Sequence, residues 1–269
     1  MQTIESAAGD VGLFDGTDAD IFNFALNLES LEAEYYLRGT RGRGMDAADG
    51  GPSPGAVTGG RMVPWQNDDL KQFMEEVALN ELAHVRFYRR VLGANAGSKP
   101  ALDLTNGFGG AAKAAGRGDN FDPFASEMNF FLGGMLMEDV GVTAYHGAVP
   151  LIQDKKNLDA AAGILAVEAY HMGMARALLY RMGADARKAA NAISDARDKL
   201  DGPKDVSPPS RNAKLFCSGL GSNVGDMPVE LNEFFGSMIN MDDPKHFRLR
   251  NLVAKGFTPK EISRVEQYV

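Results

Sequence analysis

Four stretches of the chain carry apolar residues at alternating spacings of three and four positions, the pattern of an amphipathic α-helix. Side chains that can accept hydrogen bonds from free backbone amides stand near the starts of these stretches, and glycines stand at or near their ends. The pattern predicts four helices that form two pairs along the chain, over residues 17–39, 67–93, 126–147 and 158–183.

Two long segments separate the predicted helices. Residues 39–60 are rich in glycine and proline, so we expect a long exposed loop inserted between the first two helices. Residues 94–123 are rich in glycine and alanine and are long enough to return across a bundle. Two helical hairpins joined by one long crossover have ferritin-like connectivity. We therefore expect an all-α, ferritin-like four-helix bundle over residues 17–183, after an N-terminal segment of residues 1–16.

Residues 184–269 are expected to add one helix and an irregular C-terminal extension that packs on the bundle. Apolar residues at Ala189, Ile193, Ala196 and Leu200 predict the helix. Residues 201–210 form a linker rich in proline, serine and lysine, and the capping-box pattern of residues 258–261 predicts a short helix in the extension.

The charge of the chain bears on its partners. It has 28 Lys and Arg against 36 Asp and Glu, a formal net charge of −8. Nucleic acid is not an expected partner, because its phosphates require a basic face. No transmembrane segment is expected, since the most apolar stretch, residues 128–137, ends at Glu138 and is far shorter than the roughly 20 residues of a spanning helix.

The single cysteine, Cys217, excludes an intrachain disulfide and a cysteine-based metal cluster. Any metal chemistry must therefore use oxygen and nitrogen ligands. Residues 1–12 lack the basic and apolar blocks of a signal peptide. The localisation is left open: a soluble protein, of an organelle or secreted after removal of a targeting peptide, fits the sequence.

Two of the four histidines lie in the same short motif. Glu81 and His84 on the second predicted helix, and Glu168 and His171 on the fourth, both form Glu-x-x-His. A spacing of three residues places the carboxylate and the imidazole on one face of a helix, with Cβ atoms roughly 5–6 Å apart. Both side chains can therefore point into one site.

A second motif repeats on the other two helices. Glu29 is followed seven residues later by Tyr36, and Glu138 seven residues later by Tyr145. The two glutamates of a half are 52 residues apart in the first half and 30 in the second, and the difference equals the 22 residues of the loop at 39–60. The two halves are therefore the same hairpin, one of them with an inserted loop.

Four glutamates in the centre of a bundle are unfavourable unless their charge is cancelled, because each isolated buried carboxylate costs several kcal/mol. Two divalent cations would cancel the four negative charges and leave the histidines neutral. Such ions would lie about 3.5–4 Å apart, bridged by glutamates, with an open position for a small oxidant. A site without thiolates suits Fe and Mn, and Zn less distinctively.

Residues 24–36, FALNLESLEAEYY, and residues 78–87, ALNELAHVRF, resemble the ferritin-like desiccation-related proteins of plants, algae and bacteria. The resemblance covers about residues 18–183. The order Glu, Glu-x-x-His, Glu, Glu-x-x-His is that of the di-iron and di-manganese carboxylate bundles. It implies a metal site whose ligands are Glu29, Glu81, His84, Glu138, Glu168 and His171.

The pair Glu138 and Asp139, with Tyr145, is also similar to manganese catalases. In those enzymes the glutamate that matches Glu168 can act as a base outside the metal coordination sphere. The resemblance therefore leaves Glu168 either a ligand or a base. Met137 stands where some manganese catalases have an arginine.

Three further residues are candidates for the site. Glu32 lies one turn after Glu29. It is interpreted as an extra metal ligand, as a hydrogen-bonding partner of the ligands, or as a solvent-exposed residue. Tyr36 and Tyr145 are expected to donate hydrogen bonds to site carboxylates, or otherwise to be core aromatics. His146 and His246 have no partner at a suitable spacing and are not expected in the site.

The leading functional hypothesis is a di-metal oxidoreductase, with Mn or Fe, that acts on hydrogen peroxide or dioxygen. A catalase-like or peroxidase-like role in oxidative or desiccation stress fits this site best. The alternatives are metal storage without turnover, a structural stress protein, and a small-molecule oxygenase or desaturase, because one fold serves many functions. A homo-oligomer is possible, and storage would require a large closed shell.

Overall fold

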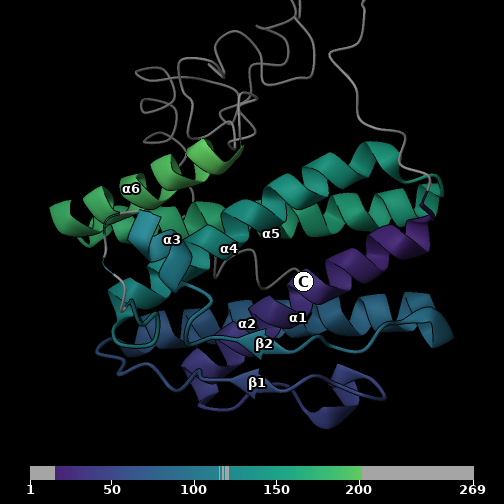
Figure 1. The fold of residues 1–269 in the computed structure, drawn as a ribbon, viewed down its shortest axis with the longest axis horizontal. Coiled ribbons are helices and arrows are strands. Elements are labelled where there is room, and N and C mark those ends of the chain that lie inside the picture. Colours follow the sequence, from purple (N-terminus) through teal and green to yellow (C-terminus); the bar gives the residue numbers. More distant parts are fainter. Residues whose placement is uncertain (1–15, 115, 117, 119–120, 202–269) are drawn as a thin grey trace, which may run out of the picture. The chain divides into compact units, whose positions relative to one another are not determined.

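The computed structural model describes residues 16–114, 116, 118 and 121–201. Four long helices form the bundle: α1 (Asp18–Arg41), α2 (Asp68–Leu92), α4 (Glu127–Ala148) and α5 (Lys155–Arg181). Helix α1 packs against α2, and α4 against α5 (Figure 1). The predicted ferritin-like helical bundle is confirmed.

The first helix is longer than the sequence pattern predicts. A capping box at Thr17 and Asp20 begins it, but it continues through Gly39 and ends at Gly42, whose φ of 73° lies in the left-handed region. The predicted end at Gly39 was wrong, because this glycine serves packing: a side chain there would overlap the ring of Phe130.

The fourth bundle helix begins one turn earlier than predicted. The side chain of Asp154 accepts hydrogen bonds from the backbone amides of Lys156 and Asn157, so α5 starts at Lys155 and not near Leu158. A short 3-10 helix, η3 (Val149–Leu151), occupies the first half of the connection between α4 and α5.

The two long connections contain regular structure that the pattern did not predict. The first holds the 3-10 helix η1 (Ala47–Gly50) and strand β1 (Val57–Thr58), and the crossover holds the 3-10 helix η2 (Gly93–Asn95), strand β2 (Leu102–Asp103) and helix α3 (Gly109–Ala114). The strands pair in parallel, with Val57 opposite Leu102. The inserted loop is therefore tied to the crossover by backbone hydrogen bonds.

Buried apolar residues form two clusters. One includes Tyr35, Phe130 and Met74, and the other includes Phe22 and Val85. Along every bundle helix, most residues of the two clusters lie on opposite sides of the candidate ligands. The order of the clusters shows that α1 and α5 run in one direction and α2 and α4 in the other.

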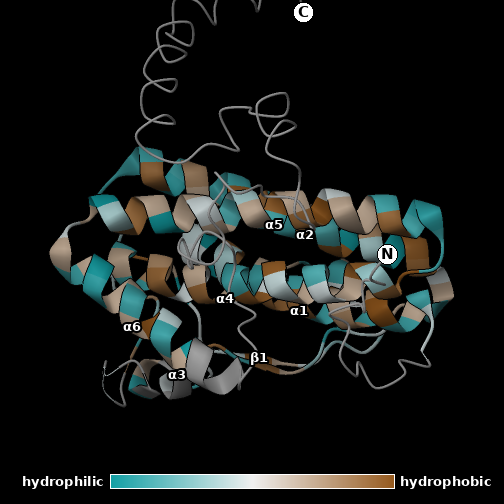
Figure 2. Ribbon diagram, turned by 90° about the horizontal axis from the view of Figure 1, so that it is seen from above, coloured by the Kyte–Doolittle hydropathy of each residue, from teal (hydrophilic) through white to brown (hydrophobic). Residues whose placement is uncertain are grey.

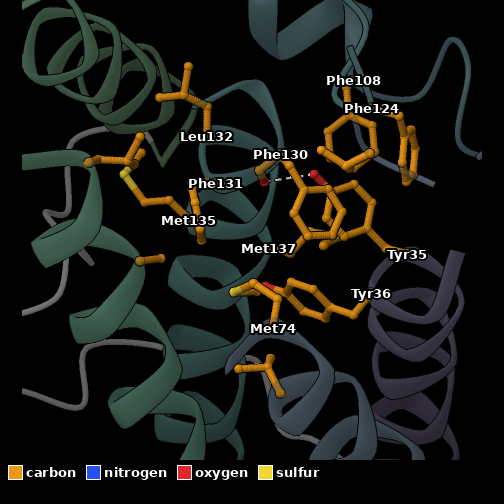
Figure 3. Packing of buried hydrophobic residues seen from close by; sticks show 14 of the residues in the cluster. Tyr35, Tyr36, Met74, Phe108, Phe124, Phe130, Phe131, Leu132, Met135 and Met137 are labelled. Carbon is orange, nitrogen blue, oxygen red and sulfur yellow. Dashed lines mark hydrogen bonds between the residues drawn. The ribbon is translucent and has the colours of Figure 1, made fainter. Parts of the chain in front are cut away.

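The first cluster has an aromatic centre (Figure 3). The rings of Tyr35 and Phe130 stack with centroids 4.6 Å apart, and the Tyr35 hydroxyl donates to the Phe130 carbonyl oxygen over 2.8 Å. Figure 2 shows hydrophobic and hydrophilic residues interleaved along α1 and α5, as expected for helices with one buried face.

Helix α6 (Ala184–Asp201) follows the bundle and packs against α3, α4 and α5. Its buried face includes Ala186, Ala189 and Ile193, so the additional helix is present as predicted. The rest of the predicted extension, including the capping box at 258–261, lies outside the described residues. No helix among the described residues is long and apolar enough to span a membrane.

Candidate metal centre

The six predicted ligands come from all four bundle helices and meet between the two apolar clusters. Each is buried: five have no exposed surface, and His84 is 9% exposed. Helix α1 contributes Glu29, and α4 contributes Glu138. Helix α2 contributes Glu81 and His84, and α5 contributes Glu168 and His171.

These residues form two overlapping groups. In each group four candidate ligand atoms lie within 4.8 Å of one another. One group adds Glu29 and His84 to the shared residues Glu81 and Glu168. The other adds Glu138 and His171 to the same two. Each group thus has one imidazole and one unshared carboxylate.

The two histidines face the same glutamate from opposite sides. Nδ1 of His84 lies 3.0 Å from Glu81 Oε2 and 3.0 Å from Glu29 Oε2. Nδ1 of His171 lies 2.7 Å from Glu81 Oε1 and 3.5 Å from Glu138 Oε2. The carboxylate of Glu81 therefore spans the distance between the imidazoles.

Several buried polar atoms of the site have no partner with hydrogen-bond geometry, although Glu81 Oε1 and Nδ1 of His171 lie only 2.7 Å apart. The atoms without such a partner are Glu81 Oε1, Glu138 Oε2, both carboxylate oxygens of Glu168, and Nδ1 of His171. Unpaired buried polar atoms are rare in native proteins because each costs about 1–3 kcal/mol. Their convergence, with oxygen and nitrogen donors only, fits a bound metal. The buried carboxylate and histidine cluster in a ferritin-like fold therefore indicates metal binding.

The electrostatics of the histidines reflect their carboxylate neighbours. Burial lowers the pKa of His84, but hydrogen bonds to Glu29 and Glu81 outweigh burial and raise this pKa to about 10. Burial is likewise outweighed at His171, where Glu138 and Glu81 raise the pKa to about 9. Without metal, both imidazoles therefore hold a proton at neutral pH.

The neighbours of each carboxyl group decide whether its pKa is raised or lowered. Burial raises the pKa of Glu29 to about 8 and that of Glu138 to about 7, although a histidine opposes each shift. Burial also acts on Glu81, but His171 and His84 together lower its pKa to about 2. Burial, with repulsion from neighbouring carboxylates, raises the pKa of Glu168 well above its usual value. The site thus holds protons that bound metal ions would displace.

The two predicted tyrosines each contact a glutamate of the other hairpin. The Tyr36 hydroxyl on α1 donates to Glu138 Oε1 on α4 over 2.6 Å. The Tyr145 hydroxyl on α4 donates to Glu29 Oε1 on α1. Each hydrogen bond fixes the orientation of one carboxylate and leaves its second oxygen directed at a histidine.

Two further residues belong to the site and were not predicted. Tyr88 on α2 forms a 2.8 Å hydrogen bond with the hydroxyl of Tyr145. It follows Glu81 by seven residues, the spacing of the two predicted tyrosines, but Ala175 stands seven residues after Glu168, so the spacing is not repeated in the second half. Asn80 Oδ1 lies 3.2 Å from Nε2 of His171, which leaves Nδ1 of that ring for the metal.

Asp139 and Arg176 form a two-bond ion pair at the edge of the site. Arg176 donates from Nε and Nη2 to the two oxygens of Asp139. Arg89 follows His84 by five residues, as Arg176 follows His171, but it donates instead to the carbonyl oxygen of Gly97. The two halves of the bundle therefore differ beyond the shared ligands.

Glu32 lies outside both four-residue groups. Its side chain is buried, with 3% of the residue exposed, and it lines a cleft beside α1 and α4. Its pKa is raised well above the usual value by burial and by Glu138, Glu81 and Glu29, so it lies near the site carboxylates. His146 is exposed on α4, and His246 lies outside the described residues.

Comparisons with known proteins identify relatives of the chain. It is 33% identical over 214 residues to the desiccation-related protein PCC13-62 of Craterostigma plantagineum, a match over 71% of this chain and 65% of that protein. It is 29% identical over 175 residues to the ferritin-like catalase Nec2 of Nesocodon mauritianus, over 62% of this chain and 54% of that protein. The chain thus spans less than two thirds of either relative.

A shorter match joins 65 residues, 46% identical, to a methyl-branched lipid omega-hydroxylase of Mycobacterium tuberculosis. It covers 24% of this chain and 15% of that protein, too little to transfer an activity. No solved structure gives a significant match. The sequence model of the ferritin-like domain matches residues 17–181, the span of the bundle. The chain belongs to the ferritin-like family, among the relatives of the desiccation-related proteins.

Proposed function

We propose that this protein is a di-metal oxidoreductase that binds two Mn or Fe ions and acts on hydrogen peroxide, with dioxygen as the other candidate oxidant. The observation that carries the proposal is the pair of four-residue groups that share Glu81 and Glu168. Two groups with shared carboxylates suit two adjacent ions better than one.

The donor set supports a redox role. Two Mn or Fe ions, each changing its oxidation state by one, would together supply or accept the two electrons that peroxide chemistry requires. The name of the catalase relative favours peroxide over dioxygen as the substrate. The desiccation-related relative favours a role in stress protection.

The chain's own residues hold the site in place. Tyr36 and Tyr145 orient the unshared carboxylates of Glu138 and Glu29 through their hydroxyl groups. Asn80 orients the ring of His171. The buried position of every donor keeps bulk water away, which strengthens the electrostatic interactions within the site.

Glu168 has a second candidate role, as the base that takes a proton from peroxide. Both of its oxygens lack a hydrogen-bond partner, and Oε1 lies 3.7 Å from Nδ1 of His84. A carboxylate in this position can either share two ions or, turned away from them, hold a proton. Burial and repulsion from neighbouring carboxylates raise its pKa, which favours the uptake of a proton.

The test is oxygen evolution from hydrogen peroxide by protein purified from cells supplied with both metals, together with the metal content per chain. We expect about two ions per chain and activity that is lost in Glu81→Ala and His171→Ala. The controls are Glu76→Ala and His146→Ala, which change exposed residues of α2 and α4. Full activity in both site variants would refute the proposal.

Two ions bound without any turnover would favour the alternative of a metal-binding stress protein. Size-exclusion chromatography then separates the remaining possibilities. A monomer or dimer leaves no room for a mineral store, whereas a large closed shell would favour storage.

A further inference from the structure

A cleft of about 300 Å³ lies between α1, α4 and the crossover segment around β2. Its walls are mainly apolar: Leu28, Leu31, Phe108, Leu136, Met137 and Val140. A single water molecule needs roughly 10–15 Å³, and pockets for small organic ligands begin near 300 Å³. The cleft is therefore much larger than hydrogen peroxide requires.

The cleft has an exposed end and a buried end. Val140 is 39% exposed, and Asp103 of the crossover is also exposed, so a molecule in solution can reach this end. Glu32 and Gly141 also line the cleft, and both are buried. The cleft therefore leads from the surface toward the bundle interior.

The buried end of the cleft lies against the candidate metal centre. Gly141 is a wall residue of the cleft, and a Cβ at this position would overlap Oε2 of Glu168. The same Cβ would lie 3.4 Å from Oε1 of Glu32. Because Gly141 has no side chain, only its backbone separates the cleft from the carboxylate of Glu168, which both four-residue groups share.

Glu32 provides the polar group of the cleft. Glu32 is 3% exposed, and none of the hydrogen bonds or ion pairs between the described residues involves its carboxylate, although its oxygens are not among the completely buried unpaired atoms of the site. A buried carboxylate without a partner is unfavourable, and a donor on a ligand would relieve this cost. An anionic ligand offers no hydrogen-bond donor to Glu32 and is repelled by this carboxylate when it is ionised.

We propose that this cleft binds a small neutral molecule with an apolar body and one hydroxyl group, which donates a hydrogen bond to Glu32. The apolar walls would take the body of the ligand, and Glu32 would orient its hydroxyl group toward the Gly141 backbone and Glu168. The inference does not depend on the redox activity proposed above, because the cleft and Glu32 are present without metal.

The test is ligand binding by ¹⁹F NMR with three probes that share one ring: 4-fluorobenzyl alcohol, 4-fluorotoluene and 4-fluorobenzoate. They differ only in carrying a hydroxyl donor, no donor, or a negative charge. On the metal-free protein we expect the alcohol to bind at least about tenfold more tightly than the toluene, and the benzoate not to bind. Equal binding of the three probes, or no binding of the alcohol, overturns the proposal.

Variants locate the binding. Val140→Trp fills the outer end of the cleft, and Leu31→Phe narrows it from α1, so both should weaken alcohol binding. The matched control is Val91→Trp, because Val91 is a comparably exposed valine on α2 outside the cleft. Glu32→Leu should remove the preference for the alcohol over the toluene. Unchanged alcohol binding in both filling variants places the ligand elsewhere and overturns the proposal.

A second measurement relates the cleft to the centre. Protein loaded with Mn²⁺ should broaden the resonance of the bound alcohol, because a paramagnetic ion relaxes only nuclei close to it. Binding to the metal-free protein without catalase activity in the loaded protein would support the cleft and refute the proposed function. Catalase activity without alcohol binding would support the proposed function and refute the cleft. The failure of one proposal can therefore be told from the failure of the other.

Discussion

Gly141 on α4 lies directly against the carboxylate of Glu168 on α5, with no room between them for a methyl group. A helix interior normally favours alanine over glycine by about 0.5–1 kcal/mol, so this glycine is retained against its helix propensity. The position therefore has a packing requirement that the repeat pattern of the sequence does not show.

We expect Gly141→Ala to lower the free energy of unfolding by about 1–3 kcal/mol and to reduce the bound metal, because the methyl group displaces Glu168. Gly163→Ala on α5 is the matched control, since a Cβ added at this glycine would meet nothing within 4 Å. It should stabilise the protein by about 0.5–1 kcal/mol. Thermal unfolding and elemental analysis measure both effects, and equal behaviour of the two variants would contradict the packing requirement at Gly141.

The tyrosine hydroxyls should matter for metal binding more than for folding. Tyr36→Phe and Tyr145→Phe each remove one hydrogen bond to a candidate ligand, so we expect about a 10–100-fold loss of metal affinity. The cost in folding free energy should be only about 1 kcal/mol. Tyr180→Phe is the control, because this residue of α5 is 66% exposed. Titration with Mn²⁺ that shows no difference from the control would refute a positioning role.

Glu168→Gln distinguishes the two roles of this residue. If Glu168 is a base only, the variant should bind about two ions per chain and lose peroxide activity. If it is a shared ligand, metal content should fall together with activity. Metal analysis and oxygen evolution on the same preparation give the answer, and a variant that keeps both metal and activity contradicts both roles.

Metal affinity should rise with pH. The metal-free site holds protons on His84, His171 and Glu29, whose pKa values are about 10, 9 and 8. Metal must displace these protons, so each proton released adds about tenfold in affinity per pH unit below the pKa concerned. Calorimetric titration with Mn²⁺ between pH 6 and 7.5, in buffers of different ionisation enthalpy, counts the protons. A pH-independent affinity would contradict the assignment.

The stability of the metal-free protein should change with pH in the opposite sense. His84 and His171 have raised pKa values in the folded state, so their contribution is complete below about pH 6.5 and is lost as the pH rises through 9 and 10. The raised pKa values of Glu29 and Glu138 act in the same direction between pH 4.5 and 8. The melting temperature should therefore fall from pH 5 to 9. Bound metal should flatten this dependence.

The sequence was sufficient to predict the four bundle helices and the convergence of the six candidate ligands. Helical spacing fixes which side chains share a face, and the duplicated motifs fix which faces meet. The end of the first helix was wrongly predicted at Gly39. In a single sequence, a glycine that ends a helix cannot be distinguished from one that makes room for a neighbouring ring. The pairing of β1 with β2 was not predicted, because strands of two residues are too short to show the alternation of apolar and polar residues that indicates a strand.

The finer parts of the site depend on contacts between helices. Tyr88 has Ala175 at the equivalent place in the second hairpin, so the repeat gave no reason to select it. The role of Asn80 depends on which ring nitrogen of His171 faces the site, which spacing does not reveal. Glu32 shares the helical face of Glu29, and only the packing of α4 against α1 shows that it lines a cleft.

The crossed hydrogen bonds from Tyr36 to Glu138 and from Tyr145 to Glu29 have the form of an isologous interface, in which equivalent residues exchange the same contact about a two-fold axis. Neither hairpin can satisfy its own buried glutamate in this way. A single hairpin would complete such a centre only by pairing with a copy of itself. The present chain carries both copies covalently joined, which leaves each free to diverge, as Tyr88 and Ala175 have done.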